Sequence, residues 1–298
     1  MHINDVEIED TYAEGFFMCG TRFIITADTL EWALEAGRKA TGFATSIIAC
    51  GAQADIECIS EHGPDGRPAI SIILMGLNLE KVAEQTLLRV GQCVMTCPTT
   101  ACFNGWQEGT FFDVGKSLRY FGDGYQISKV LFGRRFRRIP VMDGEFLCED
   151  SFGSFENGSD SNLILFGKDR ETTLIAAGRA VKAMRKSGGV ILPFPGGIVR
   201  SGSKVGSKYK TLTASTYTAC CPTLKYDPCT IVPEEANCVY EIVLCGAKES
   251  DIRRAMAAGI KAAAISGIIK ISAGNYGGNL GKVHYPLHEI LSEGAANE

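Results

Sequence analysis

Hydrophobic and polar positions follow the same order in the two halves of the chain. Runs rich in β-branched and aromatic residues predict strands, and apolar residues spaced three or four apart predict helices. In the first half the predicted elements are a strand at 23–26, a helix through 32–38, strands at 46–50 and 70–76, a helix at 78–90 and a strand at 93–97. In the second half they are a strand at 163–166, a helix through 177–179, strands at 190–194 and 240–246, a helix at 249–264 and a strand at 268–272. Each half therefore has the order β-α-β-β-α-β.

This repeated order predicts the fold class and the domain organisation. The split βαβ, or ferredoxin-like, pattern has this order, and in it two helices cover one face of an antiparallel sheet. The sequence Ala-Gly-Arg at 36–38 recurs at 177–179. We therefore expect an α+β chain of two ferredoxin-like lobes, residues 1–150 and 151–298. Residues 104–150 depart from the repeat and predict extra strands in the first lobe.

The composition is that of an ordinary globular protein, with 45% hydrophobic and 21% charged residues in a chain of 298. The first residues lack the basic and apolar regions of a signal peptide, and no run of 18 apolar residues occurs. We therefore expect a cytoplasmic protein that does not enter a membrane. The net charge of -4 argues against nucleic-acid binding. The basic run at 134–138 is either a solvated strand edge or a contact for another subunit or an acidic ligand.

Twelve cysteines raise the question of disulfides and metals. Most lie in apolar, strand-like runs, where a reduced cysteine acts as a small hydrophobic residue. Cys93, Cys97 and Cys102 suggest an iron–sulfur protein as one alternative, but they lack the C-x-x-C spacing of such proteins. His284 and His288 are four residues apart with a proline between them, which argues against a helical metal pair. We expect reduced structural thiols and no metal site.

Residues 193–210 combine four glycines, two prolines and four cationic side chains. The backbone N–H groups and cations of such a loop can surround an extended, anionic ligand. The loop does not match a nucleotide P-loop, because Ser203 and Lys204 stand in the reverse of the order that the motif requires. A flexible surface loop with solvated lysines is the alternative. The candidate substrate-binding residues here are Phe194, Gly196, Gly197, Arg200, Ser201, Ser203, Lys204 and Lys208.

Glu241 is the candidate for proton chemistry. It lies in a predicted strand, Val239-Tyr-Glu-Ile-Val243, with apolar residues on both sides. Burial would raise the pKa of its carboxyl group, as a general acid near neutrality requires, whereas an edge-strand glutamate would face water. Another glycine-rich element, at 272–282, is not followed by a helix and is therefore not a dinucleotide fingerprint. Its Asn275 and Tyr276 offer polar and planar groups to a heterocyclic, carboxylated ligand.

Several long motifs of unusual composition run in order through nearly the whole chain. They are Glu9-Asp-Thr-Tyr-Ala-Glu14, Ala40-Thr-Gly-Phe-Ala-Thr-Ser46, Pro64-Asp-Gly-Arg-Pro68, Gly91-Gln-Cys-Val-Met-Thr-Cys-Pro-Thr-Thr100, Phe194-Pro-Gly-Gly-Ile-Val199, Ser201-Gly-Ser-Lys-Val-Gly206, Val239-Tyr-Glu-Ile-Val243 and Ile271-Ser-Ala-Gly-Asn-Tyr-Gly-Gly278. Together they resemble the formylmethanofuran–tetrahydromethanopterin formyltransferases, a family known for two ferredoxin-like lobes per subunit and for homotetramers. One departure is Gly158-Ser-Asp-Ser-Asn162, where family members tend to have Gly-Gly-Asn.

The resemblance implies transfer of a formyl group between N5 of tetrahydromethanopterin and the primary amine of methanofuran or methylofuran, without a metal or prosthetic group. Glu241 matches the position of the family's candidate acid/base carboxylate. Both coenzymes carry carboxylates on long arms, which would suit the cationic loop at 193–210. The resemblance assigns holding and alignment to this loop and the proton chemistry to Glu241.

Within the family, the chain looks closer to the bacterial methylotroph branch than to the archaeal one. The motifs that give this impression are Tyr120-Phe-Gly-Asp-Gly-Tyr-Gln-Ile-Ser-Lys129, Pro140-Val-Met-Asp-Gly-Glu-Phe-Leu-Cys148 and residues 199–210. In that branch the protein is a subunit of a formyltransferase/hydrolase complex, and formyl groups usually move from tetrahydromethanopterin to the furan amine. The alternative function is a non-catalytic subunit that scaffolds such a complex.

Overall fold

The computed structural model describes residues 1–131 and 133–296, and they form two compact units. The C-terminal unit contains Met1–Phe17 and the chain from Ser159 onward, and the N-terminal unit is Met18–Gly158. The sequence analysis placed the boundary between residues 150 and 151 and counted the first 17 residues with the other lobe. The described residues contain seven α-helices, and the fold is a mixed α+β arrangement.

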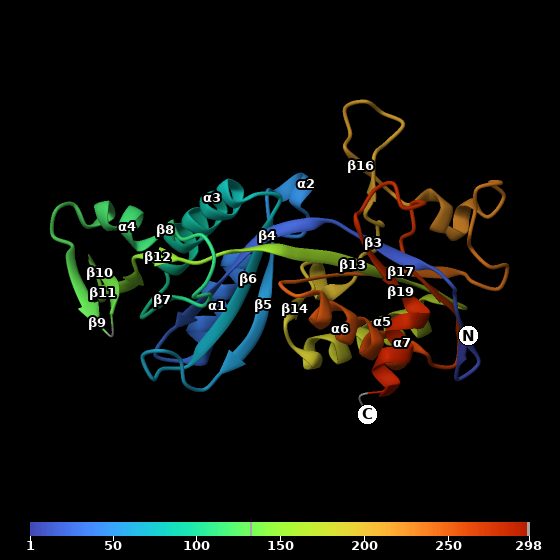
Figure 1. Cartoon of the computed structure of the whole chain (residues 1–298), viewed down its shortest axis with the longest axis horizontal. Coiled ribbons are helices and arrows are strands. Elements are labelled where there is room, and N and C mark those ends of the chain that lie inside the picture. Colours follow the sequence, from blue (N-terminus) through green and yellow to red (C-terminus); the bar gives the residue numbers. More distant parts are fainter. Residues whose placement is uncertain (132, 297–298) are drawn as a thin grey trace. The chain divides into compact units, whose positions relative to one another are not determined.

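The C-terminal unit is built on a mainly antiparallel sheet (Figure 1). Its principal elements are β13 (Phe155–Gly167), α5 (Arg170–Ser187), β14 (Val190–Ile191), β17 (Cys238–Gly246), α6 (Glu249–Ala263) and β18 (Ile268–Ser272). The strands lie in the order β18-β13-β17-β14, and each neighbouring pair is antiparallel. The second half of the chain thus has the predicted β-α-β-β-α-β order.

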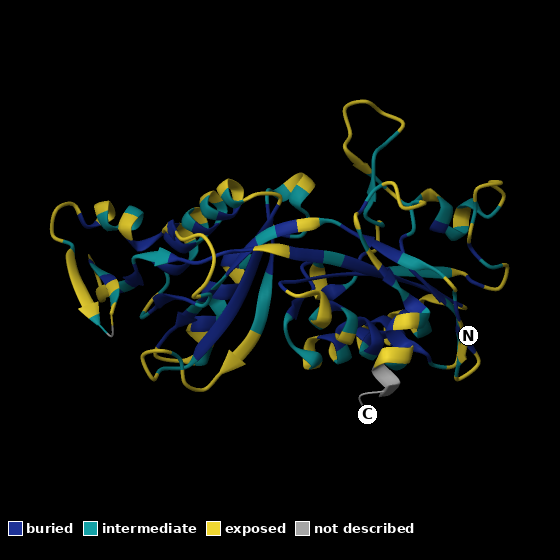
Figure 2. Cartoon of the chain, in the orientation of Figure 1, coloured by how far each residue is buried: buried dark blue, intermediate teal, exposed yellow. Residues whose placement is uncertain are grey.

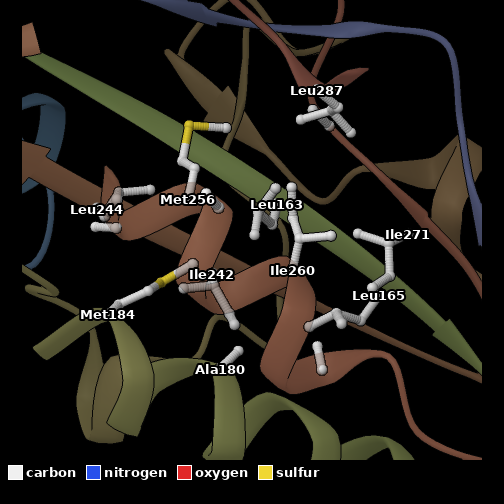
Figure 3. Packing of buried hydrophobic residues seen from close by; sticks show 14 of the residues in the cluster. Leu163, Leu165, Ala180, Met184, Ile242, Leu244, Met256, Ile260, Ile271 and Leu287 are labelled. Atoms are coloured by element: carbon white, nitrogen blue, oxygen red, sulfur yellow. The ribbon is translucent and has the colours of Figure 1, made fainter. Parts of the chain in front are cut away.

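Helices α5 and α6 cover one face of this sheet and form its core with the strands. The cluster in Figure 3 joins Leu163, Ile242 and Leu244 of the strands to Ala180 and Met184 of α5, and to residues of α6. Small residues let the helices come close: a Cβ atom added at Gly259 of α6 would lie 2.2 Å from Cε of Met184. The opposite face of the sheet packs against the long connection before β17, and it carries the candidate site.

The ends of α5 follow the rules for helix capping. The Asp169 side chain accepts a hydrogen bond from the backbone N–H of Thr172, and Glu171 lies in the first turn. Arg185 and Lys186 lie in the last turn, where cations interact favourably with the helix dipole. The observed ends of α5 therefore coincide with residues that favour the start and the end of a helix.

Further elements of the C-terminal unit come from both chain ends and from the long connection before β17. They are β1 (His2–Ile3), β2 (Val6–Ile8), β3 (Tyr12–Gly15), β15 (Lys204–Val205), β16 (Ala214–Ser215), β19 (Val283–Pro286), α7 (Leu287–Ala296) and 3₁₀ turns at Pro195–Gly197, Thr218–Cys220 and Pro222–Leu224. Strand β2 pairs in parallel with β18, and β3 pairs with β19. The β15–β16 hairpin projects from the body of this unit, and its tip is exposed (Figure 2).

The N-terminal unit repeats the same strand order. Its elements are β4 (Phe17–Thr26), α1 (Leu30–Thr41), α2 (Ile47–Cys50), β5 (Gln53–Ser60), β6 (Ala69–Gly76), α3 (Leu79–Arg89), a π-helical turn (Val90–Val94) and β7 (Ala101–Asn104). Its strands lie in the order β5-β6-β4-β7, again antiparallel. The extra elements are β8 (Phe112–Asp113), α4 (Gly115–Leu118), a 3₁₀ turn (Arg119–Gly122), β9 (Ile127–Leu131), β10 (Arg134–Val141), β11 (Gly144–Glu149) and β12 (Ser151–Phe152). Strands β11, β10 and β9 extend the sheet beyond β7, as the departure from the repeat predicted.

Two predicted strands of the first half are wrong. Residues 46–50 form the short helix α2, because the Ser46 hydroxyl accepts a hydrogen bond from the N–H of Ile48 and starts a helical turn. The second strand begins only at Gln53. The π-helical turn Val90–Val94 continues α3 into this segment and turns follow it, so residues 93–97 form no strand and the last strand begins at Ala101. A short apolar run fits a helix or a strand equally well, so periodicity alone could not decide these segments.

Within residues 1–131 and 133–296, every helix is too short or too polar to cross a membrane.

Candidate active site

Glu241 lies in β17, and strand alternation decides which way its side chain points. Ile242 and Leu244 face the helices, so Glu241 and Val239 face the other side of the sheet. That side is covered by the connection at 199–236, from which Tyr217, Cys220, Val232 and Ala236 pack against Ile164 and Phe166. Glu241 is only 4% exposed. The sequence did not decide whether this carboxyl group is buried or faces water. In the structure it is buried.

Two neutral donors hold one oxygen of this carboxyl group. Nδ2 of Asn162 donates to Oε1 of Glu241 over 2.8 Å, and Oγ of Ser203 donates to the same oxygen over 2.6 Å. Among the described residues, Oε2 of Glu241 has no hydrogen-bond partner although it is buried. The two oxygens of the group are therefore in different environments.

The surroundings raise the proton affinity of Glu241. Burial raises the pKa of its carboxyl group above the usual value, and the hydrogen bonds from Ser203 and Asn162 oppose this increase without cancelling it. Burial also raises the pKa of Asp160, which lies on the same strand as Asn162, to about 6. A carboxyl group with a raised pKa can donate or accept a proton near neutrality.

Asn162 lies on β13, two residues before Ile164, the residue paired with Glu241. The N–H of Gly274 donates to Oδ1 of Asn162 over 2.7 Å, and this contact directs the amide nitrogen toward Glu241. The sequence analysis did not select Asn162. The sequence showed it only within Gly158-Ser-Asp-Ser-Asn162, a departure from the family pattern, and in the structure this run lies inside the continuous strand β13.

The glycine-rich loop runs back along the strand that carries Glu241. The turn at Pro195–Gly197 places Gly196 and Gly197 at positive φ, and a Cβ atom at Gly197 would lie 2.9 Å from the side chain of Val181. After this turn, Val199 exchanges two backbone hydrogen bonds with Glu241, of 2.7 and 3.1 Å. The loop thus adds a short edge segment to the sheet and brings Ser203 to the carboxyl group. The loop and Glu241, which the sequence analysis treated as separate elements, form one site.

A small pocket of about 40 Å³ opens beside Glu241. Arg200 and Ser201, both predicted from the sequence, line it. The other lining residues are Ile164, Val199, Gly202, Thr216, Tyr217, Cys220, Cys221, Val239 and Glu241. Thr216, Tyr217, Cys220 and Cys221 were missed, because the segment that carries them has neither a helical nor a strand period.

Tyr276 reaches the same region from the loop at 272–282. Its ring stacks on Tyr217, with centroids 5.9 Å apart and planes at 23°. Burial raises the pKa of Tyr217 to about 12 and also raises that of Tyr276, so both phenols stay neutral. The pair offers a flat aromatic surface next to the pocket.

Glu14 shapes the loop that carries Tyr276. Its carboxylate accepts hydrogen bonds from the backbone N–H groups of Gly278, Leu280 and Gly281 over 2.8 to 3.0 Å, and from that of Tyr276. Burial would raise the pKa of Glu14, but these bonds outweigh it and lower the pKa. An ionised Glu14 is therefore a structural support for the loop.

The remaining predicted residues lie outside the pocket. Asn275 donates to Oγ1 of Thr11 over 3.1 Å and accepts from the N–H of Gly277, so it stabilises its own loop. Lys204 belongs to β15, and Lys208 is exposed on the hairpin that follows. Phe194, Gly196 and Gly197 form the turn that directs the loop toward β17.

The described residues contain no group of three or more His, Cys, Asp or Glu that could hold a metal ion. Every cysteine among these described residues is a free thiol. Cys102 and Cys148 lie directly opposite each other on β7 and β11, and burial raises the pKa of Cys102 well above its usual value.

Family models and known proteins match the chain over nearly its whole length. The model described as "Formylmethanofuran-tetrahydromethanopterin formyltransferase" matches residues 1–141, and the model "FTR, proximal lobe" matches residues 144–290. The chain is 52% identical to the formylmethanofuran–tetrahydromethanopterin formyltransferase of Methylobacillus flagellatus, over 98% of this chain and 100% of that protein.

Two solved structures are similar to this fold. The formyltransferase/hydrolase complex (FhcABCD) of Methylorubrum extorquens, solved with methylofuran, contains a chain 46% identical to this one, with a TM-score of 0.94 and 98% of each chain covered. The formyltransferase of Methanosarcina barkeri is 47% identical, with a TM-score of 0.92, over 97% of this chain and 100% of that one.

Proposed function

The chain belongs to the family of formylmethanofuran–tetrahydromethanopterin formyltransferases, and we propose that it transfers a formyl group between N5 of tetrahydromethanopterin and the primary amine of methanofuran or methylofuran. The observation that carries this proposal is a buried carboxyl group with a raised pKa and one unpartnered oxygen, Oε2 of Glu241, beside a pocket lined by Arg200. Relatives that match the whole chain bear the name of this enzyme.

The reaction needs a proton carrier and an aligned pair of ligands. The attacking amine forms a bond to the formyl carbon, the bond from that carbon to N5 breaks, and a proton passes from the amine to N5. Glu241 takes the proton from the attacking nitrogen as a carboxylate and gives it to the leaving nitrogen as an acid. A raised pKa suits both roles better than the usual value for glutamate, because it brings the titration of the group closer to neutrality.

Binding is assigned to the loop and to the aromatic pair. Arg200 and Ser201 at the pocket, with Lys204 and Lys208 along the hairpin, would attract the carboxylate arms of the coenzymes. Tyr276, stacked on Tyr217, offers a planar surface to a heterocyclic ring. In this scheme Phe194, Gly196, Gly197 and Asn275 act through the shape of the two loops that carry the binding groups.

The finer features of the fold and assembly belong to the same proposal. The strand order in each unit supports two ferredoxin-like lobes, corresponding to residues 1–150 and 151–298 apart from the first 17 residues. We infer a homotetramer that also joins other subunits, as the Methylorubrum relative does in its complex. The coenzymes act as substrates, no prosthetic group takes part, and the site of action is the cytoplasm. A non-catalytic scaffold is not favoured, because the site keeps its buried carboxyl group.

The test is formyl exchange between the two purified coenzymes, followed by separation of their formylated and free forms. We expect exchange by the wild-type protein. Glu241→Gln should lower kcat by a factor of roughly 10² to 10⁴, because the amide cannot carry the proton. If the wild-type protein fails to exchange formyl groups both alone and with its partner subunits, the enzymatic function is wrong.

A further inference from the structure

The two oxygens of Glu241 have unequal roles, and this inequality extends the proposed function. We propose that Asn162 and Ser203 are positioning residues that occupy Oε1, so that Oε2 is the oxygen that exchanges the proton with the substrate nitrogens. The inference rests on the proposed acid/base role of Glu241. It adds two residues that act through Glu241.

The lone pairs of the carboxyl group separate its two oxygens. Each carboxylate oxygen has about two positions in the plane of the group that can accept a hydrogen bond or a proton. At Oε1 the donors from Asn162 and Ser203 fill both, at 2.8 and 2.6 Å. Oε2 is buried and has no donor among the described residues. A proton that binds Glu241 therefore binds Oε2, and a nitrogen in the pocket meets this oxygen in its accepting or donating state.

The amide of Asn162 has one possible orientation. The N–H of Gly274 donates to Oδ1 over 2.7 Å, so that side of the amide must be the oxygen. Nδ2 must then point toward Glu241 as a donor. The strand register gives the same direction. Asn162 lies on the same face of β13 as Ile164, the residue paired with Glu241, so its side chain lies on the same side of the sheet as that of Glu241.

The two donors to Oε1 come from different elements. Asn162 lies in the central strand of the sheet, whereas Ser203 lies in the loop that holds Arg200 and Ser201 at the pocket. Both hydrogen bonds lower the pKa of Glu241 against the effect of burial. The loop that binds the ligand therefore also adjusts the proton affinity of the carboxyl group.

Other titratable groups face Glu241 and must be separated from it in any test. They are Asp160 of β13, Tyr276 of the loop at 272–282, and Arg200, Tyr217, Cys220 and Cys221 of the covering connection. Burial raises the pKa values of Tyr217 and Cys220 to about 12, far from the acidic limb of a pH profile. Asp160, with a pKa of about 6, is the group that could be mistaken for Glu241.

The test compares the pH profiles of kcat in variants of both donors. Ser203→Ala and Asn162→Asp each remove a donor to Oε1 and should therefore raise the pKa of Glu241. The limb due to Glu241, which is the part of the profile where kcat changes as this group ionises, should then move to higher pH. At neutral pH, kcat should fall on the order of tenfold to a hundredfold, the effect of losing one hydrogen bond to a charged group, while KM changes much less. Ser203→Thr keeps the hydroxyl group and should restore the wild-type limb.

Matched controls separate positioning from simple damage to the fold. Ser161→Ala removes the neighbouring buried hydroxyl group on the opposite face of β13, which contacts Met256, and should leave the profile unchanged. Asp160→Asn removes the repulsion between the two carboxyl groups, so it should move the limb due to Glu241 to lower pH, opposite to the donor variants, without abolishing it. The titration of Glu241 can also be followed without substrate by carboxyl-carbon NMR, with Glu241→Gln to identify the signal, and its midpoint should rise in both donor variants.

The outcomes separate this inference from the proposed function. Wild-type limbs and midpoints in Ser203→Ala and Asn162→Asp overturn the inference. A fall in kcat of equal size at every pH also overturns it, because it indicates a structural role alone. If the limb is lost in Glu241→Gln while one of these two results is found, the inference is wrong but the proposed formyltransferase function stands. If the wild-type protein does not exchange formyl groups, the proposed function itself is wrong.

Discussion

The two units of this chain place different chemistry at equivalent positions of the same sheet order. On β17 of the C-terminal unit, Glu241 lies opposite Ile164 of β13. On β6 of the N-terminal unit, Ser71 lies opposite Ile24 of β4. Two residues before these isoleucines stand Asn162 in one unit and Arg22 in the other. Each unit therefore has a polar cluster on the face of the sheet away from its helices.

The carboxylate of the N-terminal unit has partners on both oxygens. Nε and Nη2 of Arg22 each donate to Glu57 over 2.6 Å, and the Ser71 hydroxyl group adds a third bond of 3.2 Å. A bidentate guanidinium pair of this kind fixes the position of the carboxylate. In the C-terminal unit, the side chains of Asn162 and Ser203 donate to Oε1 of Glu241 as neutral groups, and Oε2 has no partner among the described residues. The comparison separates a carboxylate that stabilises the fold from one that can exchange a proton.

The second strand of the β-α-β-β-α-β order differs between the two units, and this difference accounts for the different polar clusters. In the N-terminal unit β5 is long, and its Cys58 pairs with Ser71. In the C-terminal unit β14 has two residues, and the glycine-rich loop returns to pair Val199 with Glu241 instead. Replacing a strand with a loop at this position brings Ser203 and the pocket to the carboxyl group. The candidate active site thus lies where the second half departs from the regular sheet.

The largest expected effect is on activity, and it should distinguish the two carboxylates. Glu241→Gln should lower kcat of formyl exchange roughly 10² to 10⁴-fold. Glu57→Gln, the matched substitution in the N-terminal unit, should leave kcat close to the wild-type value, because its partner is a structural guanidinium. Equal losses in the two variants would remove the distinction drawn here.

A smaller loss of activity is expected when the support of Asn162 is disturbed. A Cβ atom at Gly274 would lie 2.5 Å from Nδ2 of Asn162. Gly274→Ala should therefore displace the amide and lower kcat about tenfold, the value of one weakened hydrogen bond to a charged group. The measurement is kcat across pH, and a profile that coincides with that of the wild type would show that the amide does not act on Glu241.

Glu57→Gln, which should keep its activity, should lose stability. Glu57→Gln breaks the pair with Arg22 and should lower the free energy of unfolding by about 1–3 kcal/mol. Urea denaturation, with circular dichroism to follow the transition, measures this loss. A variant as stable as the wild type would mean that the pair with Arg22 contributes nothing net to folding.

The smallest expected effect is the pH dependence of stability due to Glu241. The folded state raises the pKa of this group, so in the interval between its unfolded and folded values the folded state binds more protons. Stability from this group is therefore present at low pH and decreases as the pH rises through the folded pKa. Relative to the wild type, Glu241→Gln should become more stable as the pH increases. A difference in unfolding free energy that does not change with pH would contradict the raised pKa.

Local patterns were enough to predict the repeated order of elements, but not every boundary. The amphipathic periods of α3, α5 and α6 and the apolar runs of β6 and β17 were recognisable in the sequence. The segments at 46–50 and 93–97 were assigned wrongly because a serine cap and a π-helical turn decided their conformation. These are local contacts that composition does not reveal.

The site could be predicted only in part, for a related reason. Glu241, Ser203 and Arg200 were visible as an acid in an apolar strand and as polar groups in a glycine-rich loop. Asn162 is 79 residues away from Glu241 in the chain, and their contact depends on the register of β13 and β17. Glu14 acts on a loop more than 260 residues away. Contacts of this length depend on the completed fold.

The most direct test of the central claim is the pH dependence of a single turnover of formyl transfer in the wild-type protein and in Glu241→Gln. The account predicts a limb in the wild type with an apparent pKa above the usual value for glutamate, and no such limb in the variant. The same limb in both proteins would show that another group moves the proton, and would contradict the role assigned to Glu241.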